Sequence, residues 1–235
     1  MNSMNNGLTL QHGSILCFGD SNTFGAHGFQ GGRYPADVRW CGRLGVDPAF
    51  AGKYEVINMG ENGRGIPGDT WEMDYVCKQM SRHTPVRLLV IMLGTNDLLM
   101  TVRSGMDGVV SMMDRFLSHL LSFTCYLPDN LQTMRLLEGP ENILLIAPVP
   151  TELSGYGPEG VRFDRLSREF GPAYQELAAR TGCHFADAGK WHIQTGPDGV
   201  HFTKEGHLRF ADSLKEELLR ILDASGGSCL GTPGS

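Results

Sequence analysis

The sequence predicts an α/β fold in which a five-stranded parallel sheet lies between two layers of helices. Short apolar runs alternate with longer segments of helical period along the 235 residues. Two of these runs, RLLVIML (87–93) and NILLIAPV (142–149), consist almost entirely of Leu, Ile and Val, which is typical of strands covered on both faces. Right-handed crossovers between such strands give a three-layer α/β/α sandwich.

Each expected strand is an apolar run of strand length, and the last of them is the weakest pattern. In chain order they are SILCFG (14–19), YEVINM (54–59), RLLVIML (87–93), NILLIAPV (142–149) and CHFADA (183–188). Functional sites of such sheets lie beyond the carboxyl ends of the strands.

The segments between the strands have the apolar spacing of helices. We expect helices at about 37–45, 69–83, 107–124, 161–181 and 205–223. Polar residues suited to cap the amino ends of three of these helices are Asp69 or Thr70, Asp107 and Thr203. Gly182 is suited to end the fourth helix.

Length and composition predict one domain, residues 12–224, with flexible tails at 1–11 and 225–235. The formal net charge is -6 and the chain has no basic run, so we expect no nucleic-acid partner. The first residues have no pattern of an export signal, and no apolar run reaches the roughly eighteen residues of a membrane span. These features predict a soluble, cytoplasmic protein without a membrane partner.

Metal and disulfide sites are not expected. The six cysteines are scattered without a C-x-x-C pair. Four histidines of the second half also lack the spacing of metal ligands: His184, His192, His201 and His207.

Polar tetrapeptides follow the expected strands: GDSN (19–22), GTND (94–97) and DGVH (198–201), with the glycine-rich GENGRG at 60–65. Ser21 by itself is also a suitable helix cap, and Asn96 and Asp198 are suitable turn residues. A serine nucleophile needs a base, and His201 follows Asp198 by three positions, so the carboxylate could orient the imidazole. Amide and glycine N–H groups could then stabilise an oxyanion.

These stretches resemble, in order, the motifs of the SGNH hydrolases, also called the GDSL esterase and lipase family. FGDSNTFG, NMGENGRG, GTND and DGVHFTKEGH carry the resemblance, which covers about residues 14–210. PADVRW (35–40) and VIMLGTND (90–97) resemble the arylesterase and acyltransferase branch. The resemblance implies a flavodoxin-like fold, no cofactor, and a serine esterase whose acyl-serine passes to water or an alcohol. The branch also allows a homo-oligomer.

Carried over by motif, the resemblance makes Ser21 the nucleophile, His201 the base and Asp198 its orienting partner. The oxyanion donors become the N–H groups of Ser21 and Gly63 and the side chain of Asn96. Gly60 is the alternative glycine.

Several nearby residues are weaker candidates. Asp187 also ends a strand, but Asp198 is favoured because it lies closer to His201 in sequence. Asp20 is expected to fix the nucleophile loop through hydrogen bonds. Surface or packing roles are favoured for His27 and Trp191 over a place at the mouth of the site.

A small ester is the expected substrate, because Phe24, Thr95 and Val200 adjoin the predicted catalytic residues and are expected to crowd the acyl side. Residues 126–142 contain leucines that could form a lid or pack against a neighbouring subunit.

Two other functions remain open from the sequence. GRGIPG (63–68) matches G-x-G-x-x-G, as in an NAD-type oxidoreductase, but it follows the second strand and no acid ends a strand about twenty residues later. The same fold could also belong to a catalytically silent binding protein. A fluorophosphonate probe separates these functions, because it labels only an activated serine.

Overall fold

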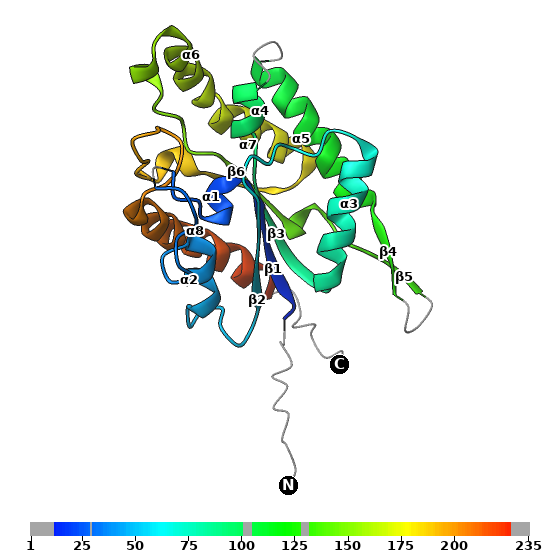
Figure 1. Ribbon diagram of the computed structural model, residues 1–235. Helices are drawn as coiled ribbons and strands as arrows, with labels where there is room; N and C mark the ends of the chain where they lie inside the picture. Colours follow the sequence, from blue (N-terminus) through cyan, green and yellow to red (C-terminus); the bar gives the residue numbers. More distant parts are fainter. Residues whose placement is uncertain (1–11, 29, 101–104, 128–131, 227–235) are drawn as a thin grey trace.

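The computed structural model describes residues 12–28, 30–100, 105–127 and 132–226. Five parallel strands form its central sheet (Figure 1). From one edge to the other they are β2 (Glu55–Gly60), β1 (Ser14–Gly19), β3 (Val86–Met92), β6 (Ile143–Ala147) and β7 (His184–Asp187). This order is that of flavodoxin-like folds, and the predicted fold class is confirmed.

Helices cover both faces of the sheet because successive side chains of its buried strands point to opposite sides. Leu89 and Ile91 belong to the core beneath α3 (Thr70–Met80), α5 (Gly105–Ser122) and α7 (Phe170–Thr181). Leu88 and Val90, between them, belong to the core beneath α2 (Trp40–Val46) and α8 (Lys204–Gly226).

Three of the expected helix ends are confirmed. Asp69 caps α3 by accepting the Glu72 N–H at 2.9 Å, and the Thr203 hydroxyl accepts the Gly206 N–H at 3.0 Å in front of α8. Gly182 ends α7 with φ +81°. Asp107 is not a cap, because α5 already begins at Gly105 and Asp107 lies in its first turn.

The helix expected at 161–181 is wrong as a single element. It is two helices, α6 (Pro158–Ser167) and α7. At the break, the Ser167 hydroxyl donates to the Asp164 carbonyl and accepts the Thr151 N–H, both within 3.1 Å. The helical period continues through this break, so periodicity alone did not reveal it.

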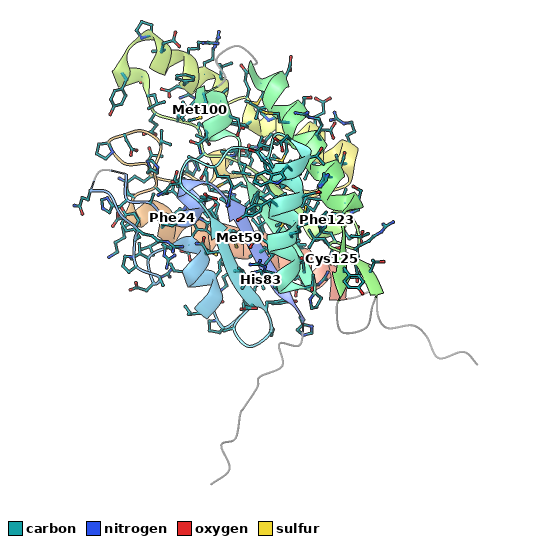
Figure 2. The ribbon with its side chains drawn as sticks, turned by 45° about the vertical axis from the view of Figure 1, so that its right-hand side comes forward. Phe24, Met59, His83, Met100, Phe123 and Cys125 are labelled. Carbon is teal, nitrogen blue, oxygen red and sulfur yellow. The ribbon has the colours of Figure 1, made fainter. Side chains whose placement is uncertain are left out.

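Of the two roles left open for 126–142, a lid over the site does not fit the part that the structure describes. β4 (Thr124–Leu127) and β5 (Gln132–Arg135) form an antiparallel hairpin there, followed by a short 3₁₀ turn, η2 (Pro140–Asn142). Helix α5 returns the chain to the amino ends of the strands before β4 begins, so the hairpin lies at the far end from α1 (Ser21–Phe24) and α4 (Thr95–Met100) (Figure 1). Figure 2 shows the same separation between Met100 and Cys125.

The remaining elements are short 3₁₀ turns: η1 (Ser81–His83), η3 (Ser154–Tyr156) and η4 (Ala188–Lys190). The expected tail 1–11 lies outside the described residues, as do 227–235, whereas 225 and 226 close α8. None of the described helices has both the length and the apolar character needed to cross a bilayer.

Candidate active site

Three predicted site residues lie beyond the carboxyl ends of three neighbouring strands. Ser21 follows β1, Gly63 follows β2 and Asn96 follows β3. Asp198 and His201 come from the loop between β7 and α8, and the structure brings this loop against α1 (Figure 1).

Ser21 is not the cap of the helix that it begins. Asp20 holds that position, and its side chain accepts the Asn22 N–H at 2.9 Å. The Ser21 hydroxyl is therefore left for another partner, which is Nε2 of His201 at 2.9 Å. Only 8% of Ser21 is exposed.

Asp198 orients His201 from the other side of the imidazole ring. Its Oδ2 lies 2.9 Å from Nδ1 of His201, and its Oδ1 accepts the N–H groups of Val200 and His201 at 3.0 Å. Burial alone would raise the pKa of the Asp198 carboxyl, but these bonds and the adjacent histidine outweigh it and lower the pKa. The ionised carboxylate can therefore stabilise an imidazolium.

Asn22 joins the nucleophile helix to the histidine loop, which sequence reasoning missed. Its amide Nδ2 donates to the Val200 carbonyl at 3.0 Å, and its Oδ1 accepts the Phe202 N–H at 2.9 Å. The Trp40 indole in turn donates to the Asn22 carbonyl at 3.0 Å. These bonds fix the distance between α1, which contains Ser21, and the loop that contains His201.

Two of the three predicted oxyanion donors, Asn96 and Gly63, meet at the loop after β2. Asn96 donates through Nδ2 to the Arg64 carbonyl at 2.9 Å, which ties α4 to the loop that contains Gly63. Gly63 has φ +74°, and its Cα faces open space. The Gly60 N–H is already bound to Oδ1 of Asn58 at 2.9 Å, so the geometry favours Gly63 over Gly60 as a donor.

Two charged residues that sequence reasoning missed fix this loop. Arg64 donates to the carbonyls of Gly19 and Met59 and pairs with Glu61 at 2.6 Å. Both carboxylate oxygens of Asp97 lie 3.1 Å from the Ile66 N–H, and burial raises the pKa of Asp97. No local sequence signal singled them out beyond their places in GENGRG and GTND.

Asp20 fixes the nucleophile loop, as predicted. Burial raises the pKa of its carboxyl to about 6, although the Asn22 N–H and the neighbouring His201 act in the opposite direction. It is 3% exposed and its contact is with the backbone of its own helix, so it acts as a positioning group.

Two of the weaker candidates contact other partners. Asp187 accepts the Gly189 N–H and pairs with Lys190 at 3.3 Å, and Trp191 packs on Phe210. His27 packs on Tyr34 but also lines the cavity beside His201 that is described below.

The predicted substrate residues do not line the cavities described below. Cζ of Arg33 lies over the Phe24 ring, 4.2 Å from the ring centroid, and Thr95 is buried. The Val200 carbonyl accepts the Asn22 amide. Their role at the acyl group stays a prediction.

His207 is buried behind the site, with its ring at edge-to-face angles to Tyr34 and Phe202. Neither ring nitrogen has a hydrogen-bond partner among the described residues. Burial, together with the neighbouring Arg39 and His201, lowers the pKa of His207 to about 4. Within the described ranges, no three His, Cys, Asp or Glu side chains are grouped as metal ligands would be.

Two cavities adjoin residues of the candidate site, one at Gly63 and one at His201. One of about 340 Å³ is lined by the 61–67 loop and by α3, and one of about 210 Å³ lies beside His201, next to His27, Gly28 and Tyr34.

Comparison with known proteins connects this geometry to a family. A sequence model described as the GDSL-like lipase/acylhydrolase family matches residues 17–209. A protein assigned as an arylesterase from Agrobacterium tumefaciens str. C58 has 30% identity and a TM-score of 0.74, over 89% of this chain and 99% of that one. No curated protein matches the sequence.

Two further solved structures are similar over nearly their whole length. A carbohydrate acetylesterase family member from Sinorhizobium meliloti has 26% identity and a TM-score of 0.74, over 90% of this chain and 99% of that one. The aryl esterase of M. smegmatis has 26% identity and a TM-score of 0.73, over 89% and 99%.

Proposed function

The chain belongs to the GDSL-like lipase/acylhydrolase family and is a carboxylic ester hydrolase, and we propose that it is a serine esterase acting on short-chain esters. The family confirms the resemblance carried by the four motifs. It also decides against an oxidoreductase that uses GRGIPG.

The observation that supports this mechanism is the continuous hydrogen-bond chain from Ser21 through His201 to Asp198. Nε2 of His201 accepts the hydroxyl proton as Oγ of Ser21 attacks the ester carbonyl. The N–H groups of Ser21 and Gly63 and the Asn96 amide stabilise the oxyanion. His201 then protonates the departing alcohol, and water, or a second alcohol, releases the acyl group from Ser21.

A fluorophosphonate probe tests the nucleophile. Wild-type protein should be labelled on Ser21 and should lose hydrolysis of phenyl acetate, whereas Ser21→Ala should resist labelling and keep its fold by circular dichroism. His201→Ala should lower kcat about 10⁴-fold or more, and the double variant should be no worse than either single variant. Labelling of Ser21→Ala at the wild-type rate would assign the nucleophile elsewhere.

The short acyl preference has its own measurement. Specificity constants for phenyl esters with acyl groups of two, four and eight carbons should fall with chain length, since Phe24, Thr95 and Val200 are expected to crowd the acyl group. An optimum at eight carbons would contradict the proposed acyl site.

A further inference from the structure

We propose that Asp164, a buried residue of α6, is a positioning residue that holds Asp198 in place through the loop that follows β6. This inference rests on the proposed function only in taking Asp198 as the group that orients His201. The loop, residues 151–156, bonds to Asp164 on one side and to the segment that contains Asp198 on the other. Helix α6 lies at the same end of the sheet as α4, which contains Asn96 (Figure 1).

The carboxylate of Asp164 organises the 151–156 loop. Its Oδ1 accepts the Thr151 hydroxyl at 2.9 Å and the Leu153 N–H at 2.7 Å, and its Oδ2 accepts the Ser154 N–H at 2.8 Å. All three donors belong to the loop, so these bonds do not cap the helix that contains Asp164. Only 5% of Asp164 is exposed. A buried carboxylate is costly unless it is hydrogen-bonded, so these bonds favour a single conformation of the loop.

The other side of the loop is bonded to the segment that contains Asp198. The Glu152 N–H donates to the Gly199 carbonyl at 2.8 Å. The Tyr156 hydroxyl donates to the Pro197 carbonyl at 3.0 Å. Asp198 stands between these two acceptors in the sequence, so the loop holds the backbone on both sides of it.

Glu152 makes two further contacts with the same segment. Its Oε2 accepts the Thr195 hydroxyl at 3.0 Å. Its carbonyl lies so close to Gly199 that a Cβ on this glycine would be 2.2 Å from the carbonyl oxygen. Gly199 is buried and has φ +67°, so the two backbones meet where a side chain has no room. A shift of the loop would therefore displace the segment that contains Asp198.

The two members of the Asp198–His201 pair thus have separate supports. The bonds of Asn22 hold the segment on either side of His201, whereas the 151–156 loop holds it on either side of Asp198. A misplacement of about 1 Å can cost about 10²-fold in rate. Asp164 should therefore affect kcat, although it does not touch the reacting atoms.

Asp164→Ala tests the proposal, with kinetics measured on phenyl acetate and folding checked by circular dichroism. It should lower kcat about 10- to 100-fold, because Asp198 is displaced. KM should change little, since neither Asp164 nor the loop lines the cavities at Gly63 and His201. Asp164→Asn keeps Oδ1 as an acceptor and should recover part of the loss in kcat.

Asn142→Ala is the matched control for a loss of stability alone. Asn142 is also buried, and its side chain accepts the Gly139 N–H and donates to the Arg87 carbonyl. These bonds lie at the amino ends of β3 and β6, away from the candidate site. Asn142→Ala should lower the melting temperature, as Asp164→Ala does, and should keep the wild-type kcat.

A second variant acts on the far side of the loop without emptying a buried position. Tyr156→Phe combined with Thr195→Val removes both side-chain bonds between the loop and the segment. It should lower kcat about threefold or more and leave the melting temperature nearly unchanged. A wild-type kcat in Asp164→Ala or in this double variant would overturn the proposal. Equal losses of kcat in Asp164→Ala and Asn142→Ala would overturn it as well.

Proton NMR separates this inference from the proposed function. The proton between Nδ1 of His201 and Asp198 gives a low-field resonance, which is identified by its loss in His201→Gln. Asp164→Ala should shift or broaden this resonance, and Asn142→Ala should leave it unchanged. The measurement needs no substrate, so it decides the role of Asp164 even if the chain does not hydrolyse short-chain esters. An unchanged resonance in Asp164→Ala would show that Asp164 does not position the pair.

Discussion

Asn96 carries the side-chain contribution to the proposed oxyanion hole. Its amide nitrogen carries two N–H groups, of which one donates to the Arg64 carbonyl and the other can donate to the oxyanion. Asn96→Ala should therefore lower kcat by about 10² to 10³ and change KM little. Steady-state kinetics on phenyl acetate measures both. A raised KM with unchanged kcat would instead make Asn96 a substrate-binding residue.

Because Gly28 has no side chain, the Asp198–His201 pair can occupy the space beside its Cα. A Cβ at this position would lie 2.0 Å from Oδ2 of Asp198 and 2.8 Å from Cβ of His201. Gly28→Ala should displace the pair and lower kcat/KM by about 10² without lowering the melting temperature. Gly155→Ala is the matched control, because a Cβ there meets no atom within 4 Å. Full activity in Gly28→Ala would show that the pair tolerates the displacement.

At the scale of elements, Asn22 couples α1 to the loop before α8. Asn22→Ala removes the acceptor of the Phe202 N–H, which lies on a buried residue, so the free energy of unfolding should fall by about 1–3 kcal/mol. Hydrolysis should fall as well, because the separation of Ser21 and His201 is no longer fixed. Urea denaturation and kinetics measure the two effects. Asn22→Asp keeps the acceptor and should lose less stability, so equal losses in both variants would contradict this account.

The sequence predicts elements better than it predicts contacts between them. All five strands of the central sheet were predicted, because buried strands are continuous apolar runs, whereas the hairpin of β4 and β5 was not. The polar residues after these strands pointed to Ser21, Asn96 and His201. The bonds from Asn22 to Val200 and from Asp97 to Ile66 span 178 and 31 positions, so no local pattern contains them. The break between α6 and α7 depends in the same way on Thr151, a residue from another segment.

At the scale of the whole molecule, the buried His207 should make stability depend on pH. In the unfolded chain the His207 imidazole binds a proton below about pH 6.5, whereas in the folded chain it does so only near pH 4. Stability should therefore fall as the pH falls between these values, by up to about 3 kcal/mol. The Asp20 carboxyl affects the pH dependence of stability in the opposite direction, because its pKa, raised to about 6, favours the folded state at low pH.

Comparison of variants isolates the contribution of His207. Urea denaturation at pH 7 and pH 4.5 should show a smaller difference for His207→Phe than for wild type, because phenylalanine has no proton to bind. His12→Gln is the control, since His12 is exposed, and it should keep the wild-type difference. An unchanged pH difference in His207→Phe would assign the acid sensitivity to other groups.

The hydrogen bond between Ser21 and His201 joins positions 180 residues apart. During synthesis, a chain that has emerged only as far as β6 contains Ser21, Gly63 and Asn96 but no base, so its serine is unreactive. In refolding, this contact closes one of the longest loops of the chain and requires β7 and α8 to dock. Fluorophosphonate labelling should thus return no earlier than the far-ultraviolet circular dichroism signal. The rate at which Ser21 becomes reactive then measures how fast β7 and α8 dock on the sheet.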